Sequence, residues 1–120
     1  MKLRSRLRPK WYFGANTLNI NTMRDFRDYD IWIDAMNIVD KTYIIVDGFP
    51  KKEQFSLSSQ ITRSAVSIPS NIAEGAGRNT GKEFARFLDF SLGSAYEWET
   101  QLIIAEKRKY IKQNEFKLIL

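Results

Sequence analysis

The sequence predicts an all-α protein that folds as an antiparallel up-down four-helix bundle. Apolar residues recur at steps of three and four over most of residues 30–109, which is the period of helices with a buried face. Short turn signals at residues 47–50 and 75–79 separate these segments. The β-branched run at residues 42–46 has no partner strand elsewhere, so we expect helix there as well. Long helices joined by short turns favour an antiparallel bundle.

The first helix is expected to begin near Asp30, where Asp28 and Asp30 suit the positive end of a helix. Gly48 and Pro50 mark its end, because glycine suits a left-handed cap and proline cannot continue a helix. Its apolar face repeats at helical spacing and comprises Trp32, Ala35, Met36, Val39, Tyr43 and Val46.

The second helix is expected from about Lys52 to Ala76, with Pro69 inside it. Proline removes a hydrogen bond and crowds the carbonyl of Ala65, so either a kinked continuous helix or a break into two is possible. The apolar period passes through Pro69 without slipping, which favours the continuous helix. Ser67, Ser70 and Asn71 lie where they could satisfy backbone groups that the proline frees.

The third helix is expected from Gly81 to about Lys109, after a turn at residues 75–79. Thr80 and Glu83 have the spacing of a capping box. Gly93 and Ser94 are small residues where another helix could approach closely. A fourth helix is expected from Lys112 to Leu120, and it is short compared with the others.

The composition restricts the chemistry that the chain could perform. With 120 residues it is long enough for one domain and one modest core. Apolar residues make up 43% and charged residues 28%, as in ordinary soluble globular proteins. The chain has no cysteine and no histidine, which removes thiolate chemistry, the commonest metal ligand and the usual general base at neutral pH. We therefore expect no enzyme, no metal, no cofactor and no small-molecule substrate.

The net charge of +5 is concentrated at the N-terminus. Residues 1–22 contain five of the 19 basic side chains and none of the 14 acidic ones, so residues 23–120 are electrically neutral. We expect residues 1–22 to be a disordered basic extension and residues 23–120 to be the bundle domain. In one interpretation the extension results from translation at an upstream start, with Met23 as the natural beginning. In another it is an arm that binds phosphate, and the aromatic run at residues 11–13 stacks on bases or packs on the bundle.

No apolar run approaches the roughly 18 residues needed to span a membrane. The basic start is not followed by a continuous apolar region, so it is a poor signal peptide. The sequence therefore predicts a cytoplasmic protein without membrane contact.

A polar stripe follows the second helix at heptad spacing, and a matching stripe follows the third. We interpret these stripes as a structural seam or a subunit interface, in which Arg63 and Glu97 form an ion pair that fixes the register of the helices. Binding of a ligand or partner is the alternative. The predicted seam comprises Gln60, Arg63, Ser64, Ser67, Pro69, Asn71, Glu74, Gly75, Gly93, Ser94, Glu97 and Gln101.

Four cations cluster where the third helix ends, namely Lys107, Arg108, Lys109 and Lys112. They could simply complement the negative end of the helix dipole. The alternative is a patch that contacts the phosphates of RNA or DNA and is repeated around an oligomer.

Three stretches of the chain carry a resemblance to a known family: residues 30–36, residues 60–75 and residues 87–102. The segment Ser-Ile-Pro-Ser-Asn-Ile-Ala-Glu-Gly at 67–75 is the most specific of them. Over about residues 26–112 the chain resembles the small four-helix-bundle proteins encoded in intervening sequences of bacterial large-subunit ribosomal RNA genes. Some members are labelled ribosomal proteins, and a related branch contains the accessory proteins of diversity-generating retroelements.

The resemblance implies a left-handed four-helix bundle that assembles into a homopentameric ring, with no established enzymatic activity. In the retroelement branch, the ring is basic and binds a reverse transcriptase and nucleic acid. We therefore expect an oligomeric interaction scaffold, with a nucleic acid, a reverse transcriptase or a ribonucleoprotein as the partner. The competing hypothesis is a self-associating structural module with no nucleic-acid partner.

Overall fold

In the computed structural model, residue 7 and residues 25–119 are described. Residues 25–119 form four α-helices and two short 3₁₀-helices, and they contain no β-strand, which confirms the all-α prediction. The elements in chain order are η3 (Phe26–Asp28), α2 (Asp30–Asp47), η4 (Lys51–Glu53), α3 (Leu57–Ala76), α4 (Gly81–Lys107) and α5 (Gln113–Ile119).

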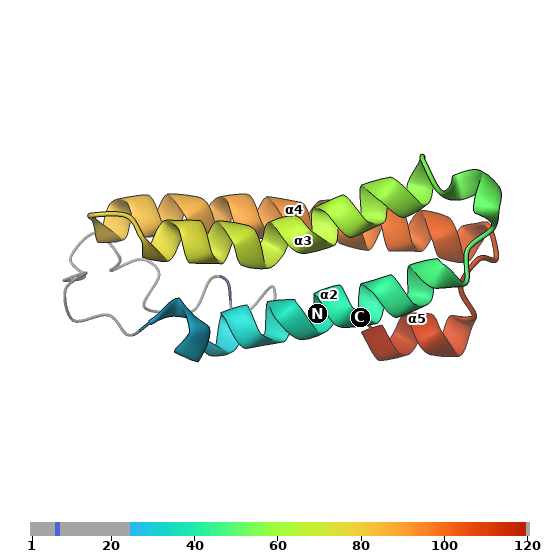
Figure 1. Cartoon of the computed structure of the whole chain (residues 1–120), viewed down its shortest axis with the longest axis horizontal. Helices are drawn as coiled ribbons and strands as arrows, with labels where there is room; N and C mark the ends of the chain where they lie inside the picture. Colours follow the sequence, from blue (N-terminus) through green and yellow to red (C-terminus); the bar gives the residue numbers. More distant parts are fainter. Residues whose placement is uncertain (1–6, 8–24, 120) are drawn as a thin grey trace.

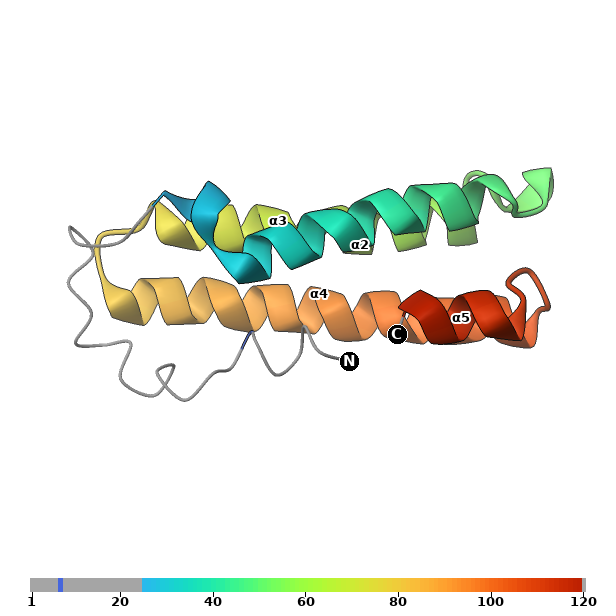
Figure 2. The same cartoon turned by 90° about the horizontal axis from the view of Figure 1, so that it is seen from below.

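The three long helices lie side by side, and each runs opposite to the one before it in the chain (Figure 1). The view turned by 90° shows α2 and α3 in one layer and α4 and α5 in the other (Figure 2). In both views α2 and α4 occupy diagonal corners of the bundle, while α5 lies beside only the C-terminal part of α4. The described residues thus build three full sides of the expected four-helix bundle and a short part of the fourth.

The bounds of α2 are those expected, but its two ends differ from the expectation in detail. Ahead of it, the carboxylate of Asp25 accepts a hydrogen bond of 2.9 Å from the backbone N–H of Arg27, and this bond lowers the pKa of Asp25. At the other end, the predicted left-handed cap is wrong, because Gly48 has φ −85° and remains in the right-handed region. The N–H of Gly48 instead closes a tight turn onto the carbonyl of Ile45 at 3.1 Å.

The N-terminal boundary of α3 was predicted too early, at Lys52 instead of Leu57. Residues 51–53 form a 3₁₀-helix, and Ser56 has φ −125° and ψ −99°, well outside the helical region. The hydroxyl of Ser56 donates to the carboxylate of Glu53 at 2.8 Å. Serine side chains that bond locally compete with helix formation, which explains the later start.

Pro69 lies inside α3, and the prediction of one continuous helix is confirmed. Ser70 donates to the carbonyl of Val66 and Asn71 to the carbonyl of Ser67, both at 2.8 Å. These bonds serve neighbouring carbonyls and do not reach Ala65, whose carbonyl is the one that the proline ring frees. Ser70 and Asn71 thus bond to backbone carbonyls near Pro69, but not to the carbonyl that the proline frees.

Helix α4 begins as expected, since the hydroxyl of Thr80 accepts a bond of 3.1 Å from the N–H of Glu83. It ends at Lys107, two residues before the predicted end. There the chain reverses through Lys109, which has φ 61°, while the N–H of Tyr110 donates to the carbonyl of Ala105 at 2.9 Å. This left-handed residue ends the helix in the manner of a Schellman turn.

The hydrophobic core lies between α2, α3 and α4, and its largest fully buried members include Trp98, Phe84, Ile61, Ile68 and Leu102. Leu7 also belongs to this core and is fully buried. The predicted disorder of residues 1–22 otherwise falls outside the described residues. Among the described residues, no helix combines the length and the apolar character needed to cross a bilayer.

Candidate functional site

The predicted polar seam exists in part, as two hydrogen-bonded groups between α3 and α4. In the first group, the hydroxyl of Ser64 donates to Oε1 of Gln101 at 2.7 Å, and both side chains are buried. The amide of Gln101 in turn donates to the carboxylate of Glu97 at 3.2 Å, at the edge of the bundle. Because Ser64 lies on α3 and Gln101 on α4, this group links the two helices at one position along their axes.

The second group lies nearer the turn between the helices. The hydroxyls of Ser67 and Ser94 are 2.8 Å apart, and the amide of Asn71 donates to the hydroxyl of Ser67 at 3.0 Å. From the pair 64–101 to the pair 67–94 the residue number rises along α3 and falls along α4, as antiparallel packing requires. The two groups together fix the register of α3 against α4.

The predicted ion pair between Arg63 and Glu97 is wrong. Both residues are exposed, and the ion pairs among the described residues join Arg27 to Asp25 and Arg78 to Glu74 instead. Arg63 and Glu97 lie on the outer edges of their helices, where water solvates both charges and little is gained by pairing them. Gln60 is exposed as well and forms no part of the two groups.

The remaining predicted seam residues have different surroundings. Pro69 is buried on α3. Gly75 is also buried, and a Cβ atom added there would lie 2.6 Å from Cβ of Phe87, so this position requires glycine. Gly93 is exposed on α4 and has no heavy atom within 4 Å of such a Cβ. The close approach that we expected at Gly93 therefore does not come from another helix of the described chain.

Sequence reasoning missed two buried polar contacts that join other pairs of elements. The indole Nε1 of Trp98 donates to the hydroxyl of Thr42 at 3.0 Å, which connects α4 to α2. The hydroxyl of Ser91 donates to the carbonyl of Ile68 at 2.8 Å, which connects α4 to α3. A signal for the first contact was present, because a tryptophan on an apolar stripe needs an acceptor for its N–H.

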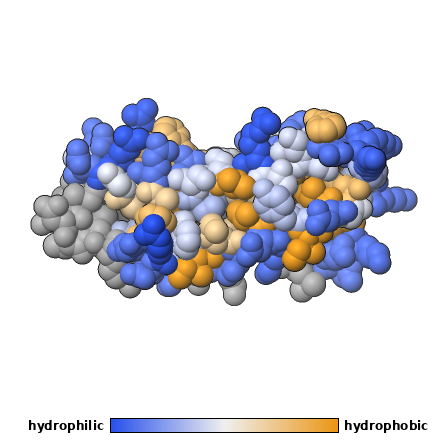
Figure 3. Space-filling model, in the orientation of Figure 1, coloured by the Kyte–Doolittle hydropathy of each residue, from blue (hydrophilic) through white to orange (hydrophobic). Residues whose placement is uncertain are grey.

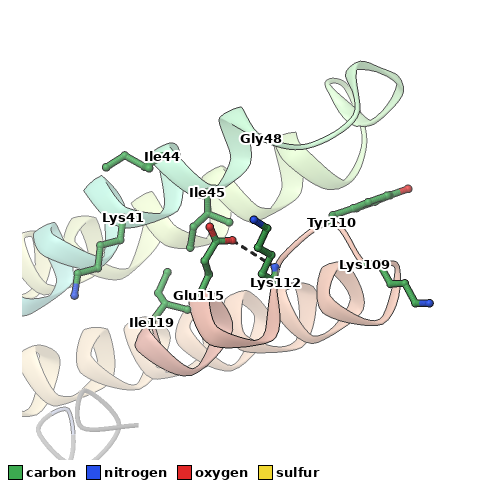
Figure 4. Close-up of a pocket in the computed structure, with 9 residues that line it drawn as sticks. All are labelled: Lys41, Ile44, Ile45, Gly48, Lys109, Tyr110, Lys112, Glu115 and Ile119. Atoms are coloured by element: carbon green, nitrogen blue, oxygen red, sulfur yellow. Dashed lines mark hydrogen bonds between the residues drawn. The ribbon is translucent and has the colours of Figure 1, made fainter.

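The basic cluster borders a cleft of about 660 Å³ between the C-terminal half of α2 and the α4–α5 connection. Its walls are formed by Lys41, Ile44, Ile45, Gly48, Lys109, Tyr110, Lys112, Glu115 and Ile119 (Figure 4). Lys109 and Lys112 are thus the two members of the predicted cluster that line it, whereas Lys107 and Arg108 do not.

Figure 4 shows how the side chains of this cleft are directed. Ile45 and Ile119 point into it from opposite walls, Glu115 lies between them, and Lys112 lies beside Glu115 on the side toward Tyr110. Lys41 and Lys109 lie at its two ends and point outward. The carboxylate of Glu115 accepts a bond of 3.4 Å from the backbone N–H of Lys112. The cleft therefore has apolar side chains on its facing walls and a lysine at each end.

The hydrogen bonds of the seam support a structural role for its side chains. The seam consists mostly of neutral hydroxyls and amides bonded to one another, and within the described part of the chain neither Ser64 nor Ser67 forms a hydrogen bond to a basic side chain. Among the described residues, no three histidine, cysteine, aspartate or glutamate side chains gather where they could hold a metal ion. The geometry defines a helical-bundle protein whose polar groups position its helices.

The comparison with family models identifies the chain more closely. The model described as "23S rRNA-intervening sequence protein" matches residues 27–120, and the chain belongs to this family. The match confirms the family expected from residues 60–75 and its neighbours. Among curated proteins, none matches the chain.

Proposed function

We propose that this protein is a non-enzymatic, self-associating scaffold that binds nucleic acid through the basic cluster at the end of α4. The observation that carries the proposal is a set of large apolar side chains exposed on α2, namely Ile33, Met36, Tyr43 and Ile44. Ile44 is the most exposed of them, at 73%. A row of exposed apolar residues on one helix is typical of a protein–protein contact.

The spacing of these residues supports a continuous contact surface. Ile33, Met36 and Ile44 share the side of α2 that faces away from Thr42, which is buried in the core. Figure 3 views the molecule from the side of α2 and α3, and apolar patches lie there among hydrophilic residues. A second copy of the chain would bury this surface.

A second surface lies on α4, at the diagonal corner of the bundle (Figure 2). Ile103 and Ile104 are exposed there, and Ile104 lies on the same side of the helix as the open Gly93. A closed ring forms when one surface of each copy contacts a different surface of the next. Two distinct apolar surfaces on opposite corners of the bundle suit such head-to-tail assembly, and the family resemblance favours five copies.

We expect the change Ile44→Arg to convert the assembly into single chains. The unpaired charge would have to be buried in the contact, whereas in the single chain this side chain already faces water. Size-exclusion chromatography with light scattering should give a multiple of the 14.1-kDa chain mass for the unchanged protein and 14.1 kDa for the variant. The matched control is Asn79→Arg, an exposed position in the turn before α4. A single-chain mass for the unchanged protein would refute self-association.

The nucleic-acid part of the proposal depends on the charges around the cleft. Lys107, Arg108, Lys109 and Lys112 are all exposed, and none of them forms an ion pair with another described residue. Lys41 adds a fifth cation at the other end of the cleft. Unpaired cations close together can bind successive phosphates, and repetition around an assembly would multiply weak contacts. The resemblance supports a reverse transcriptase or a ribonucleoprotein as the further partner.

We expect the double change Arg108→Glu/Lys112→Glu to weaken RNA binding and its dependence on salt. Each lost phosphate contact with a single strand lowers the slope of log K against log salt by about 0.7. Fluorescence anisotropy with a labelled single-stranded RNA at several salt concentrations measures this slope. The control Lys82→Glu/Arg86→Glu makes the same change in charge at the opposite end of α4. Equal slopes for both double variants would show that the cluster is not the binding site.

The second candidate function is a self-associating structural module without a nucleic-acid partner. The neutrality of residues 23–120 favours it, because the 14 basic side chains of that part are balanced by 14 acidic ones. Absence of RNA binding by the assembled protein at low salt would select this function. The cytoplasmic location remains a prediction in either case.

A further inference from the structure

The outer faces of α2 and α4 have the same heptad spacing. Each face holds five exposed residues that follow one another at steps of 3, 4, 3 and 4, within about 80° around the helix. The face of α2 comprises Ile33, Met36, Asp40, Tyr43 and Asp47. The face of α4 comprises Gly93, Tyr96, Thr100, Ile103 and Lys107. Each residue number on α4 exceeds its counterpart on α2 by 60, so the two faces can meet position by position.

Side by side and in the same direction, these two faces are complementary in shape. In two parallel helices with heptad spacing, equivalent positions lie opposite each other. Ile33 would then lie on Gly93, where no heavy atom is found within 4 Å of an added Cβ atom. Tyr43 would lie on Ile103, and these side chains are 50% and 38% exposed in the single chain. The contact would therefore bury apolar side chains at both of these positions.

The charges of the two faces also match in this direction. Asp47 at the C-terminal end of α2 would meet Lys107 at the C-terminal end of α4. Neither residue forms an ion pair within the described part of the chain, so both are available to a partner. In the opposite direction Asp47 would lie near Gly93, and the pairing with Lys107 would be lost. Charge therefore favours the parallel arrangement.

The parallel direction is also the one that a ring requires. Within one chain, α2 and α4 run the same way along the bundle (Figures 1 and 2). Rotating a copy about an axis parallel to the bundle preserves this direction. In such a ring, α2 of one copy therefore meets α4 of the next in parallel.

A ring closes only if the residues that meet lie at the same level along its axis. Within one chain, Trp98 bonds to Thr42, and the rings of Tyr110 and Phe49 pack with 5.6 Å between their centroids. The residue numbers in these two pairs differ by 56 and 61. The offset of 60 between the two faces lies within about one helical turn of both values. Copies joined in this register would stay at nearly the same level, so the assembly closes instead of growing as a filament.

We propose that α2 of one copy packs in parallel against α4 of the next, with residues 33–47 opposite residues 93–107. This inference rests on the proposed self-association and adds the direction, the register and the closure of the assembly. Lys107 then belongs to the contact between copies, while the other three cations of the basic cluster remain available to phosphate.

The register can be tested with disulfides, because the chain has no cysteine of its own. We expect oxidation of the variant Tyr43→Cys/Ile103→Cys to link neighbouring copies into multiples of 14.1 kDa on a non-reducing gel. A disulfide needs Cα atoms within about 7 Å of each other, which only facing positions provide. The matched control Tyr43→Cys/Gly93→Cys moves the second cysteine by about 15 Å along α4 and should be linked at least 10-fold less. Linking of the control in preference to the first pair would overturn the parallel register.

The pairing of Asp47 with Lys107 has a test of its own, which measures the dissociation constant between copies by analytical ultracentrifugation. Asp47→Lys and Lys107→Asp should each raise this constant at least fivefold, because two like charges would then face each other. The double variant Asp47→Lys/Lys107→Asp should return it to within twofold of the unchanged protein. A double variant as weak as the two single changes combined would overturn the pairing.

Self-association and this particular contact can be refuted separately. A single-chain mass for the unchanged protein would refute both of them. An assembled protein in which the variant Tyr43→Cys/Ile103→Cys does not cross-link would refute only the contact between α2 and α4. A mass that keeps growing with concentration would refute the closure of the ring.

Discussion

Replacing Trp98 with alanine should lower the free energy of unfolding by about 3–5 kcal/mol. Trp98 is fully buried at the centre of the core, so its removal leaves a large cavity that neighbouring side chains can fill only in part. The change also removes the hydrogen bond of 3.0 Å that its indole donates to Thr42. Since single domains are stable by about 5–15 kcal/mol, this loss is a large part of the total.

The cost of the cavity and the cost of the lost hydrogen bond can be separated with more conservative changes. Thr42→Val keeps the volume but leaves the buried indole N–H without its acceptor, which should cost about 1–3 kcal/mol. Trp98→Phe keeps part of the volume and leaves the hydroxyl of Thr42 with its bond of 2.6 Å to the carbonyl of Ile38. Equilibrium denaturation in urea, monitored by circular dichroism, gives all three values. A cost below about 1 kcal/mol for Trp98→Ala would contradict the core position of this residue.

The helices could be predicted because their signals are local. The period of apolar residues and the turn residues near Gly48 and Gly77 predict the existence and order of α2, α3 and α4, and both ends of α2. Errors occurred where a short-range contact competes with the helix. The bond from Ser56 to Glu53 delays α3, and the left-handed Lys109 ends α4 early. Neither outcome follows from residue types, because serine and lysine also occur inside helices.

The seam could be predicted only as two stripes. Helical spacing shows which residues share a side, and it correctly placed Ser64 and Gln101 on facing sides. It does not show how far one helix is rotated or shifted against the other, so Arg63 was paired with Glu97 although both lie outward. The contact between Trp98 and Thr42 joins α4 to α2, which are not consecutive in the chain. Helical spacing within a single sequence does not show which residues of two such helices lie in contact.

Gly75→Ala should destabilise the protein by about 1–3 kcal/mol, although alanine is the better helix former. A Cβ atom at this position would lie 2.6 Å from Cβ of Phe87 and 3.4 Å from the carbonyl oxygen of Phe84. The first contact involves an atom fixed to the backbone of α4, so α3 and α4 would have to move apart. Phe87 also packs edge-on against Phe90 and lies beneath the guanidinium of Arg78, which limits how it can shift.

Gly93→Ala is the matched control, because it makes the same change inside a helix without any contact. No heavy atom lies within 4 Å of the added Cβ, so the change should stabilise the single chain by up to about 1 kcal/mol through helix propensity alone. Opposite signs for the two variants in thermal and urea denaturation would show that packing against Phe87 determines the first effect. If Gly75→Ala stabilised the protein as much as Gly93→Ala, the close contact between α3 and α4 at Gly75 would be wrong. The register set by Ser64 and Ser67 would then need revision, since the same two helices form both features.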